Sequence, residues 1–367
     1  MKERERMTKL EFSTWDILNW PHKGVPVEGE LQTKVYQDHM EEWVYAEEQG
    51  FDAVWLTEHH FTDYNLLPSP NIMLAALTQK TNKIKIGNMI NALNFNDPWR
   101  LAEEFAMLDV LSNGRLLIGL GRSADILEYD KYGMPMSEGR PRFQEGLNLI
   151  KKAFTEDVVN FDGEFYRMLG GSLVPRPLQK PYPTIYTTVL SPESFSWAAK
   201  EGLPISSIFL PTITMAEKFK FYMSECEKFG REPDPKNFLV CRHVYVADSK
   251  EQAIEDAKEP MLDFLRLFRS HAVPAKQEQL ATFPENFKYF TQFYAPFFGG
   301  ALTYESFIES GMLIVGDPES VVDQIQSQQQ EIGLSHLMCG MSFGNLSHDK
   351  VMNSMKLFGE KVMPNFK

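Results

Sequence analysis

A glutamate and two histidines stand side by side in the segment WLTEHHF, directly after the short apolar run Ala53–Thr57. The run is typical of a buried strand, so Glu58, His59 and His60 are expected at its carboxyl end. In an α/β barrel this end of a strand carries the catalytic groups, and an imidazole there can transfer protons near neutral pH. The structural alternative is that one histidine closes the strand or packs beneath the next loop.

Two other segments are suited to binding an anion. GLGRS, residues 119–123, combines glycines that allow close approach of the backbone with Arg122, whose guanidinium can hold a phosphate by two hydrogen bonds. In TVLSPES, Ser191 fits an N-cap and Pro192 the first helical position, and a helix start offers unpaired N–H groups and the positive end of its dipole. A tight turn with a surface arginine, and simple helix capping, explain the same residues without a ligand.

Short apolar runs alternate with amphipathic helical stretches along the chain. This alternation predicts βα units with parallel strands, and the runs are apolar throughout because such strands are buried on both faces. Eight runs favour a closed (β/α)8 TIM barrel with insertions over a doubly wound sheet, which has fewer strands and a glycine fingerprint. The predicted strands are Leu10–Thr14, Ala53–Thr57, Ile84–Met89, Leu116–Gly119, Thr184–Thr188, Ile205–Phe209, Leu239–Val246 and Leu334–Cys339. The predicted helices include Gln32–Gln49, Pro98–Leu111, Gly139–Phe154, Thr214–Lys228 and Ser249–Phe268.

Local chemistry supports several element ends. Asp97 followed by Pro98 predicts a helix start, Gly50 predicts a helix end, and Asp317 is the expected cap of a further helix. The stretch Phe161–Tyr182 interrupts the alternation, and we interpret it as a hairpin-like excursion that leads into the fifth strand.

A long stretch, Ser270–Gly311, is rich in aromatic residues and poorly periodic. It contains Phe290, Phe293, Tyr294, Phe297, Phe298 and Gly299-Gly300. A loop of this length is usually functional, commonly a lid, and the alternative is a packed insertion that covers the edge of the barrel. We expect residues 8–367 to form one domain with this insertion, after a flexible extension of residues 1–7.

Composition excludes several classes of protein. Hydrophobic residues make up 43% of the chain and aromatic residues 13%, enough for a large core and an apolar pocket. The net charge of −13 argues against a nucleic-acid surface. The three cysteines lie far apart, which fits a reduced protein without disulfides. The charged start is unlike a signal peptide, and no window approaches the roughly 20 apolar residues of a membrane helix. We expect a soluble cytoplasmic protein.

Metal-dependent hydrolysis is the competing chemistry for a barrel with histidines. Amidohydrolase-type barrels use two histidines separated by one residue, whereas His59 and His60 are adjacent, so both cannot point inward from a regular strand. His243 and His336 fall within later strand runs but show no recognisable ligand spacing. No metal site is predicted.

Several ordered blocks of the chain resemble the luciferase-like monooxygenase family over nearly its whole length. They are GFDAVWLTEHHFTDYNLLPSP, KIGNMINALNFNDPWRLAEEFAMLDVLSNGRLLIGLGR, RPLQKPYPTIY, WAAKEGLP and MCGMSFGNLSHDKVMNSMKLFGEKVMPNF. The resemblance implies a TIM barrel, reduced FMN (FMNH2) as cofactor and O2 as co-substrate. It also implies a separate flavin reductase as partner and association into a homodimer.

The resemblance assigns roles to individual residues. His59 matches the catalytic histidine, and His60 its more structural neighbour. Met89-Ile90 matches a cis peptide beneath the flavin ring. The residues that match the phosphate site are Arg122, Leu190 (through its backbone N–H), Ser191 and Ser194. Glu58, His60 and Phe209 are expected to line the substrate pocket.

Some positions depart from the luminous members of the family. Gly121 stands where luciferases have a reactive cysteine, and Phe209 where they have a tryptophan; the stretch Ser270–Gly311 does not align with their mobile loop. HVYVADSKEQA and LIVGDPESV are closer to non-luminous members, including Baeyer–Villiger monooxygenases. The expected activity is oxygenation of a small apolar aldehyde, ketone or terpene-like substrate through a flavin (hydro)peroxide. A deazaflavin-dependent hydride-transferring oxidoreductase and a non-catalytic flavin-binding relative are the alternatives.

Overall fold

A computed structural model describes residues 9–273, 277–290, 292, 295 and 302–367. These residues divide into two compact units. The first unit comprises residues 9–55, 189–265 and 302–367, and the second comprises residues 56–188 and the described residues from 266 to 295. The expected extension of residues 1–7 lies outside the described residues, and the prediction of one domain stays a prediction.

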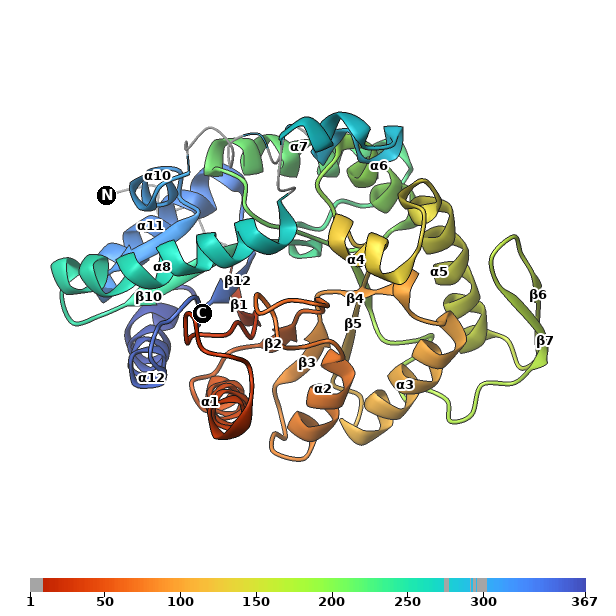
Figure 1. Cartoon of the computed structure of the whole chain (residues 1–367), viewed down its shortest axis with the longest axis horizontal. Coiled ribbons are helices and arrows are strands. Elements are labelled where there is room, and N and C mark those ends of the chain that lie inside the picture. Colours follow the sequence, from red (N-terminus) through yellow and green to blue (C-terminus); the bar gives the residue numbers. More distant parts are fainter. Residues whose placement is uncertain (1–8, 274–276, 291, 293–294, 296–301) are drawn as a thin grey trace. The chain divides into compact units, whose positions relative to one another are not determined.

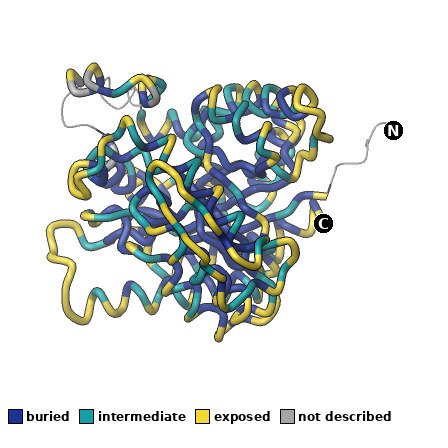
Figure 2. The backbone as a smooth tube through the Cα atoms, turned by 90° about the vertical axis from the view of Figure 1, so that its right-hand side faces the viewer, coloured by how far each residue is buried: buried dark blue, intermediate teal, exposed yellow. Residues whose placement is uncertain are grey.

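The first unit is built on parallel strands. β12 lies between β1 and β10, with Phe12 opposite Leu337 and Val240 opposite the same residue. β10 is long enough to pair also with β9 at its start and with β11 at its end, and β2, which ends at the boundary of the unit, follows β1 in the sheet. Apart from Glu11, the residues of these strands are buried, and buried backbone is dark blue in Figure 2. They are β1 (Glu11–Asp16), β2 (Ala53–Leu56), β9 (Ile205–Ser207), β10 (Phe238–Val246), β11 (Leu313–Gly316) and β12 (His336–Gly340).

Helices pack on these strands and on one another in the first unit. α12 packs on β10, α1 on α12, and α7 on both α6 and α11. The helices are α1 (Gly29–Glu48), α6 (Pro192–Glu201), α7 (Thr212–Lys228), α8 (Lys250–Ala272, which continues beyond residue 265 into the second unit), α10 (Tyr304–Glu309), α11 (Pro318–Ile332) and α12 (His348–Leu357). Short turns of 3-10 or π helix lie at Pro235–Asn237, Phe358–Val362 and Met363–Asn365.

The second unit has its own parallel strands in the order β3, β5, β8. β4 pairs with the end of β5 (Figure 1). α2 packs on β3, and α3 packs on β5 and α5. The strands are β3 (Lys85–Asn88), β4 (Asn91–Ala92), β5 (Leu116–Gly121), β8 (Ile185–Thr188) and the hairpin β6 (Val159–Asp162) with β7 (Arg167–Gly171). The helices are α2 (Pro70–Thr78), α3 (Pro98–Leu111), α4 (Ile126–Tyr132) and α5 (Gly139–Thr155), with 3-10 turns at Leu93–Phe95, Met136–Glu138, Gln277–Thr282 and Glu285–Phe287.

The predicted element ends follow from local chemistry that the structure shows directly. The Asp97 side chain accepts a hydrogen bond from the backbone N–H of Arg100, and Asp317 does the same for Ser320. Gly50 has a φ of +81°, a conformation that favours glycine after a helix. The predicted strands and helices match observed ones within a few residues. The hairpin-like excursion is confirmed as β6–β7, although it begins at Val159 rather than at Phe161.

Part of the expected lid is described. Its first residues, from Ser270 to Ala272, form the end of α8, and the short turns Gln277–Thr282 and Glu285–Phe287 follow. Phe293, Tyr294, Phe297, Phe298 and Gly299-Gly300 lie outside the described residues. A lid therefore stays a prediction. Across the part of the chain that is described, none of the helices has the length and apolar character needed to cross a membrane.

Candidate active site

His59 lies three residues beyond β2, in a loop that the local sequence holds in place. The backbone N–H of Met89 donates to the carbonyl of Leu56 at the strand end (2.7 Å). Just beyond it, the Asn65 side-chain amide donates to Thr57 Oγ1 (2.8 Å). The loop closes back on the strand, and it leaves the His59 side chain 27% exposed.

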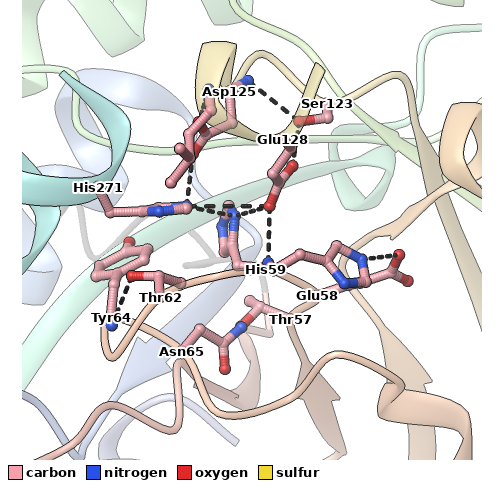
Figure 3. A network of polar contacts seen from close by, with 12 residues as sticks. Thr57, Glu58, His59, Thr62, Tyr64, Asn65, Ser123, Asp125, Glu128 and His271 are labelled. Atoms are coloured by element: carbon pink, nitrogen blue, oxygen red, sulfur yellow. Dashed lines mark hydrogen bonds and ion pairs between the residues drawn. The ribbon is translucent and has the colours of Figure 1, made fainter. Parts of the chain in front are cut away.

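Glu128, in the first turn of α4, holds the His59 ring (Figure 3). His59 Nδ1 lies 3.1 Å from Glu128 Oε1, which also accepts the backbone N–H of His60 (3.0 Å). The other carboxylate oxygen accepts from Ser123 Oγ (2.7 Å). An ionised carboxylate only accepts hydrogen bonds, so the proton of His59 sits on Nδ1 and the lone pair of Nε2 is left for chemistry.

The same pairing sets the protonation of both groups. Burial by itself would lower the pKa of His59, but the hydrogen bond to Glu128 and the nearby carboxylates outweigh it, so the pKa is raised above its ordinary value. Burial would raise the pKa of Glu128, yet the hydrogen bonds from His59 and Ser123 lower it on balance. The pair therefore favours a charged carboxylate beside a readily protonated imidazole.

A second histidine and a second carboxylate complete the group. His271, in the last turn of α8, has a fully buried side chain, and its Nε2 lies 2.5 Å from Asp125 Oδ2 and 3.3 Å from His59 Nδ1. We call His59, Asp125, Glu128 and His271 the His59 cluster. Each contributes one nitrogen or oxygen atom, and all four atoms lie within 4.8 Å of one another. Such atoms could ligate a metal ion, although here they pair with one another.

Glu58 and His60 form a separate polar network beside the cluster. Buried Glu58 accepts from His60 Nε2 (3.1 Å), from the Asn96 amide (3.0 Å) and from the Asn91 amide. The other nitrogen of His60 pairs with the Tyr132 hydroxyl (3.1 Å). Both ring nitrogens of His60 are therefore engaged within this network, and the structural role that the resemblance implied stays a prediction.

The glycines of GLGRS lie against the segment Asn88–Ile90, Gly119 against its backbone and Gly121 against the Ile90 side chain. The Met89–Ile90 peptide bond is cis, as the resemblance implied. A Cβ on Gly119 would lie 2.0 Å from the Asn88 carbonyl oxygen, and one on Gly121 would lie 2.8 Å from Ile90 Cδ1. The sequence interpretation that these glycines allow close approach is therefore correct, but the partner that approaches is the chain itself.

Arg122 follows these glycines and is held through its backbone. Its carbonyl accepts from the Tyr129 hydroxyl (2.6 Å) and from the Asn94 amide (2.9 Å). Its guanidinium carbon lies 4.1 Å from the ring centre of Phe287, within the described part of the expected lid.

The expected phosphate-site turn of the first unit is a well-formed helix cap. The Ser191 hydroxyl accepts from the backbone N–H of Ser194 (3.3 Å), and the Ser194 hydroxyl donates to the carbonyl of Ser191 (2.6 Å). The N–H of Leu190, the expected phosphate donor, donates to Ser194 Oγ (3.2 Å). Capping thus accounts for the present hydrogen bonds of all three residues.

Phe209 lies among aromatic side chains of the first unit, with a φ of +57°. Its ring is 6.4 Å from Trp15, 5.9 Å from Phe264 and 6.1 Å from His243, measured between ring centres. Burial in this apolar group lowers the pKa of His243 to about 3. His243 is therefore a neutral packing residue.

Sequence reasoning missed Asp125, Glu128, His271 and Tyr64. One signal was present: Asp125 and Glu128 are three residues apart directly after GLGRS, the spacing of a helix cap with an acid in the first turn. No local pattern pointed to His271, because its role depends on a contact with residues far away in the sequence.

The family model of luciferase-like monooxygenases matches residues 12–336. The oxygenase component of the flavin-dependent trigonelline monooxygenase of Acinetobacter baylyi is 28% identical over 352 residues, covering 92% of this chain and 91% of the relative.

Two solved structures share the fold. The oxygenating constituent of 3,6-diketocamphane monooxygenase from Pseudomonas putida, in complex with FMN, has a TM-score of 0.79 at 18% identity and covers 98% of this chain and 99% of its own. The coenzyme F420-dependent tetrahydromethanopterin reductase of Methanopyrus kandleri has a TM-score of 0.71 at 20% identity and covers 98% and 100%.

The predicted (β/α)8 barrel is confirmed by these likenesses, so the chain is an α/β barrel protein. More particularly, it belongs to the luciferase-like monooxygenase family. The prediction of a monooxygenase of this family is confirmed as well.

Proposed function

We propose that this protein is the oxygenase of a cytoplasmic two-component system. It would use reduced FMN, delivered by a separate flavin reductase, and O2 to oxygenate a small apolar aldehyde, ketone or terpene-like substrate. The observation that carries the proposal is the His59–Glu128 pair, an imidazole at a strand end that a buried carboxylate holds in one tautomer. A homodimer is the assembly we expect from the family.

The residues of the chain have the chemistry that FMN requires. Arg122 provides a guanidinium suited to a phosphate, and the N-terminus of α6 provides N–H groups with the hydroxyls of Ser191 and Ser194. We propose that these residues bind the phosphate, with Leu190 contributing through its backbone. The segment at Met89-Ile90 would support the ring. When bound, reduced flavin supplies the electrons that activate O2.

His59 would manage the proton on the reacting oxygen. With Nδ1–H directed at Glu128, Nε2 can carry a second proton, give it up and take it back. The raised pKa keeps a larger share of His59 protonated near neutral pH than a free imidazole would have. Phe209 would border the apolar substrate, while Glu58 and His60 would shape the loop that carries His59.

The test compares His59→Ala with wild-type protein. We expect reduced FMN to bind with nearly unchanged affinity, while substrate-dependent O2 uptake falls about 10²-fold or more, the usual contribution of a general acid or base. His22→Ala, a histidine of the first unit, is the control. Normal turnover by His59→Ala would show that His59 does not have this role.

A deazaflavin-dependent oxidoreductase is the second candidate, because an F420-dependent enzyme shares the fold. That cofactor carries a long acidic tail and would favour a more basic channel than a chain of net charge −13 suggests. Difference spectra with each reduced cofactor separate the two, since only the cofactor that is used should bind at micromolar concentration.

A further inference from the structure

A contact between an arginine and a phenylalanine joins the expected phosphate site to the described part of the expected lid. The guanidinium carbon of Arg122 lies over the Phe287 ring, 4.1 Å from its centre. Arg122 directly follows β5, whereas Phe287 ends the turn Glu285–Phe287, and both belong to the second unit. Phe287 is fully buried and Arg122 is half-buried, so the contact is partly withdrawn from water.

Tyr129 of α4 supports Arg122 at its backbone and, through Phe287, at its guanidinium. The Tyr129 hydroxyl donates to the Arg122 carbonyl (2.6 Å), and the two aromatic rings meet edge-on, with 5.7 Å between their centres and an angle of 81°. The buried Asn94 amide donates to the same carbonyl (2.9 Å) and to the Tyr129 hydroxyl (2.8 Å). That hydroxyl lies so close to Gly139 that a Cβ there would collide with it. One tyrosine therefore holds both the Arg122 backbone and the ring that faces its guanidinium.

An aromatic ring can hold a guanidinium without using its hydrogen-bond donors. The attraction acts between the positive charge and the negative face of the ring, whereas a phosphate is recognised by N–H groups in the guanidinium plane. One arginine can therefore make both interactions at once. An arginine side chain also loses rotamer freedom when a ligand fixes it. Because the Phe287 ring restricts the guanidinium beforehand, less freedom remains to be lost when a phosphate binds.

We propose that Phe287, supported by Tyr129, is a positioning residue that holds the Arg122 guanidinium ready for the FMN phosphate. The inference rests on the proposed function, in which Arg122 binds that phosphate. It makes the turn Glu285–Phe287 part of what distinguishes FMN from riboflavin, which has no phosphate. Because the coupling between two interactions is reciprocal, bound phosphate also stabilises this turn.

Truncation of Phe287 would not isolate this role. The ring also packs on Phe290, with 5.8 Å between ring centres, so its loss would disturb packing as well as the contact with Arg122. A replacement that keeps the size of the ring is therefore needed. Pentafluorophenylalanine has nearly the shape of phenylalanine, but its ring face is no longer negative and does not attract a cation.

The experiment introduces pentafluorophenylalanine at position 287 of the full chain and measures binding of FMN and of riboflavin by fluorescence titration. We expect FMN to bind about 3- to 30-fold more weakly, the range of a partly to fully desolvated cation–π contact, with riboflavin binding unchanged. In substrate-coupled turnover, KM for reduced FMN should rise while kcat stays the same. Tyr129→Phe, which keeps the ring and loses the hydrogen bond to Arg122, should weaken FMN binding by about 2- to 10-fold.

The matched control is pentafluorophenylalanine in place of Phe165, whose ring lies under another arginine of the second unit, Arg142, at 4.5 Å. It should leave the binding of both flavins unaltered. The proposal is overturned if the change at Phe287 weakens FMN and riboflavin equally or leaves both unchanged, since the ring then only fills space. Tighter binding of FMN would overturn it too, because the ring would then compete with the phosphate.

Failure of the proposed function gives a different result. If Arg122→Ala binds FMN as wild type does, Arg122 does not hold the phosphate, and both its proposed role and that of Phe287 are wrong. If Arg122→Ala weakens FMN binding selectively while pentafluorophenylalanine at position 287 does not, the role of Arg122 stands and only that of Phe287 is overturned.

Discussion

Replacing Glu128 by glutamine removes the charge that faces His59 while keeping nearly the same shape. The two side chains are 3.1 Å apart, and an opposite charge this close moves a pKa by about 1 to 3 units. Loss of this charge should therefore lower the raised pKa of His59, and each unit of pKa corresponds to about 1.4 kcal/mol.

The consequence for catalysis depends on pH in a defined way. Well above both pKa values, the protonated share of His59 falls about tenfold for each unit lost, so oxygenation should slow by about 10- to 1000-fold. Well below both values, His59 is protonated in either protein and the two rates should converge. The assay is substrate-coupled O2 uptake with reduced FMN across the pH range, with flavin binding measured separately.

Glu145→Gln is the matched control, because Glu145 also lies in the second unit and accepts several backbone N–H groups, from Glu164, Phe165 and Tyr166. It should leave the pH profile unshifted. A Glu128→Gln profile that is lowered equally at every pH, or that is not displaced at all, would refute the argument that Glu128 sets the protonation of His59.

Three further predictions follow from other parts of the structure. His39 has its pKa raised to about 9 from 6.5, since the charge and hydrogen bond of Asp16 and the charges of its acidic neighbours outweigh burial. The stabilisation that charged His39 gives to the folded protein is complete below about pH 6.5 and is lost as pH rises through about 9. His39→Gln should therefore flatten the fall of Tm measured between these two pH values. Gly119→Ala should destabilise the protein more than Gly121→Ala, because its Cβ meets backbone rather than a flexible side chain; urea unfolding that ranks them otherwise contradicts this. Arg122→Ala should weaken binding of FMN, measured by fluorescence titration, by about 1.5 to 3 kcal/mol, with riboflavin binding unchanged as the sign that the phosphate contact was lost.

Local chemistry made much of this fold predictable from the sequence. Apolar runs placed the buried strands, and Asp97, Asp317 and Gly50 placed helix ends, because caps and left-handed glycines act within a few residues. β11 (Leu313–Gly316) was missed, since four apolar residues before a helix give no strand-specific pattern. α4 was missed although Asp125 marks its start.

The sequence alone could predict only those residues of the candidate site whose position follows from their own segment. His59 and Arg122 were found because each follows a strand, where barrels place functional groups. The residues that hold His59 come from α4 and α8, and nothing near His271 in the sequence shows that it meets Asp125. Likewise, the second glycine of GLGRS was explained only by the position of Ile90. Contacts between distant segments decide these roles.

The most direct test of the central claim is a single turnover under ¹⁸O2 with protein-bound reduced FMN and a panel comprising a long-chain aldehyde, a cyclic ketone and a cyclic terpene. The account predicts one ¹⁸O atom in the product of at least one substrate, with the yield sharply reduced in His59→Ala while FMN remains bound. Conversion of a substrate without ¹⁸O, or an equal yield from His59→Ala, would contradict it.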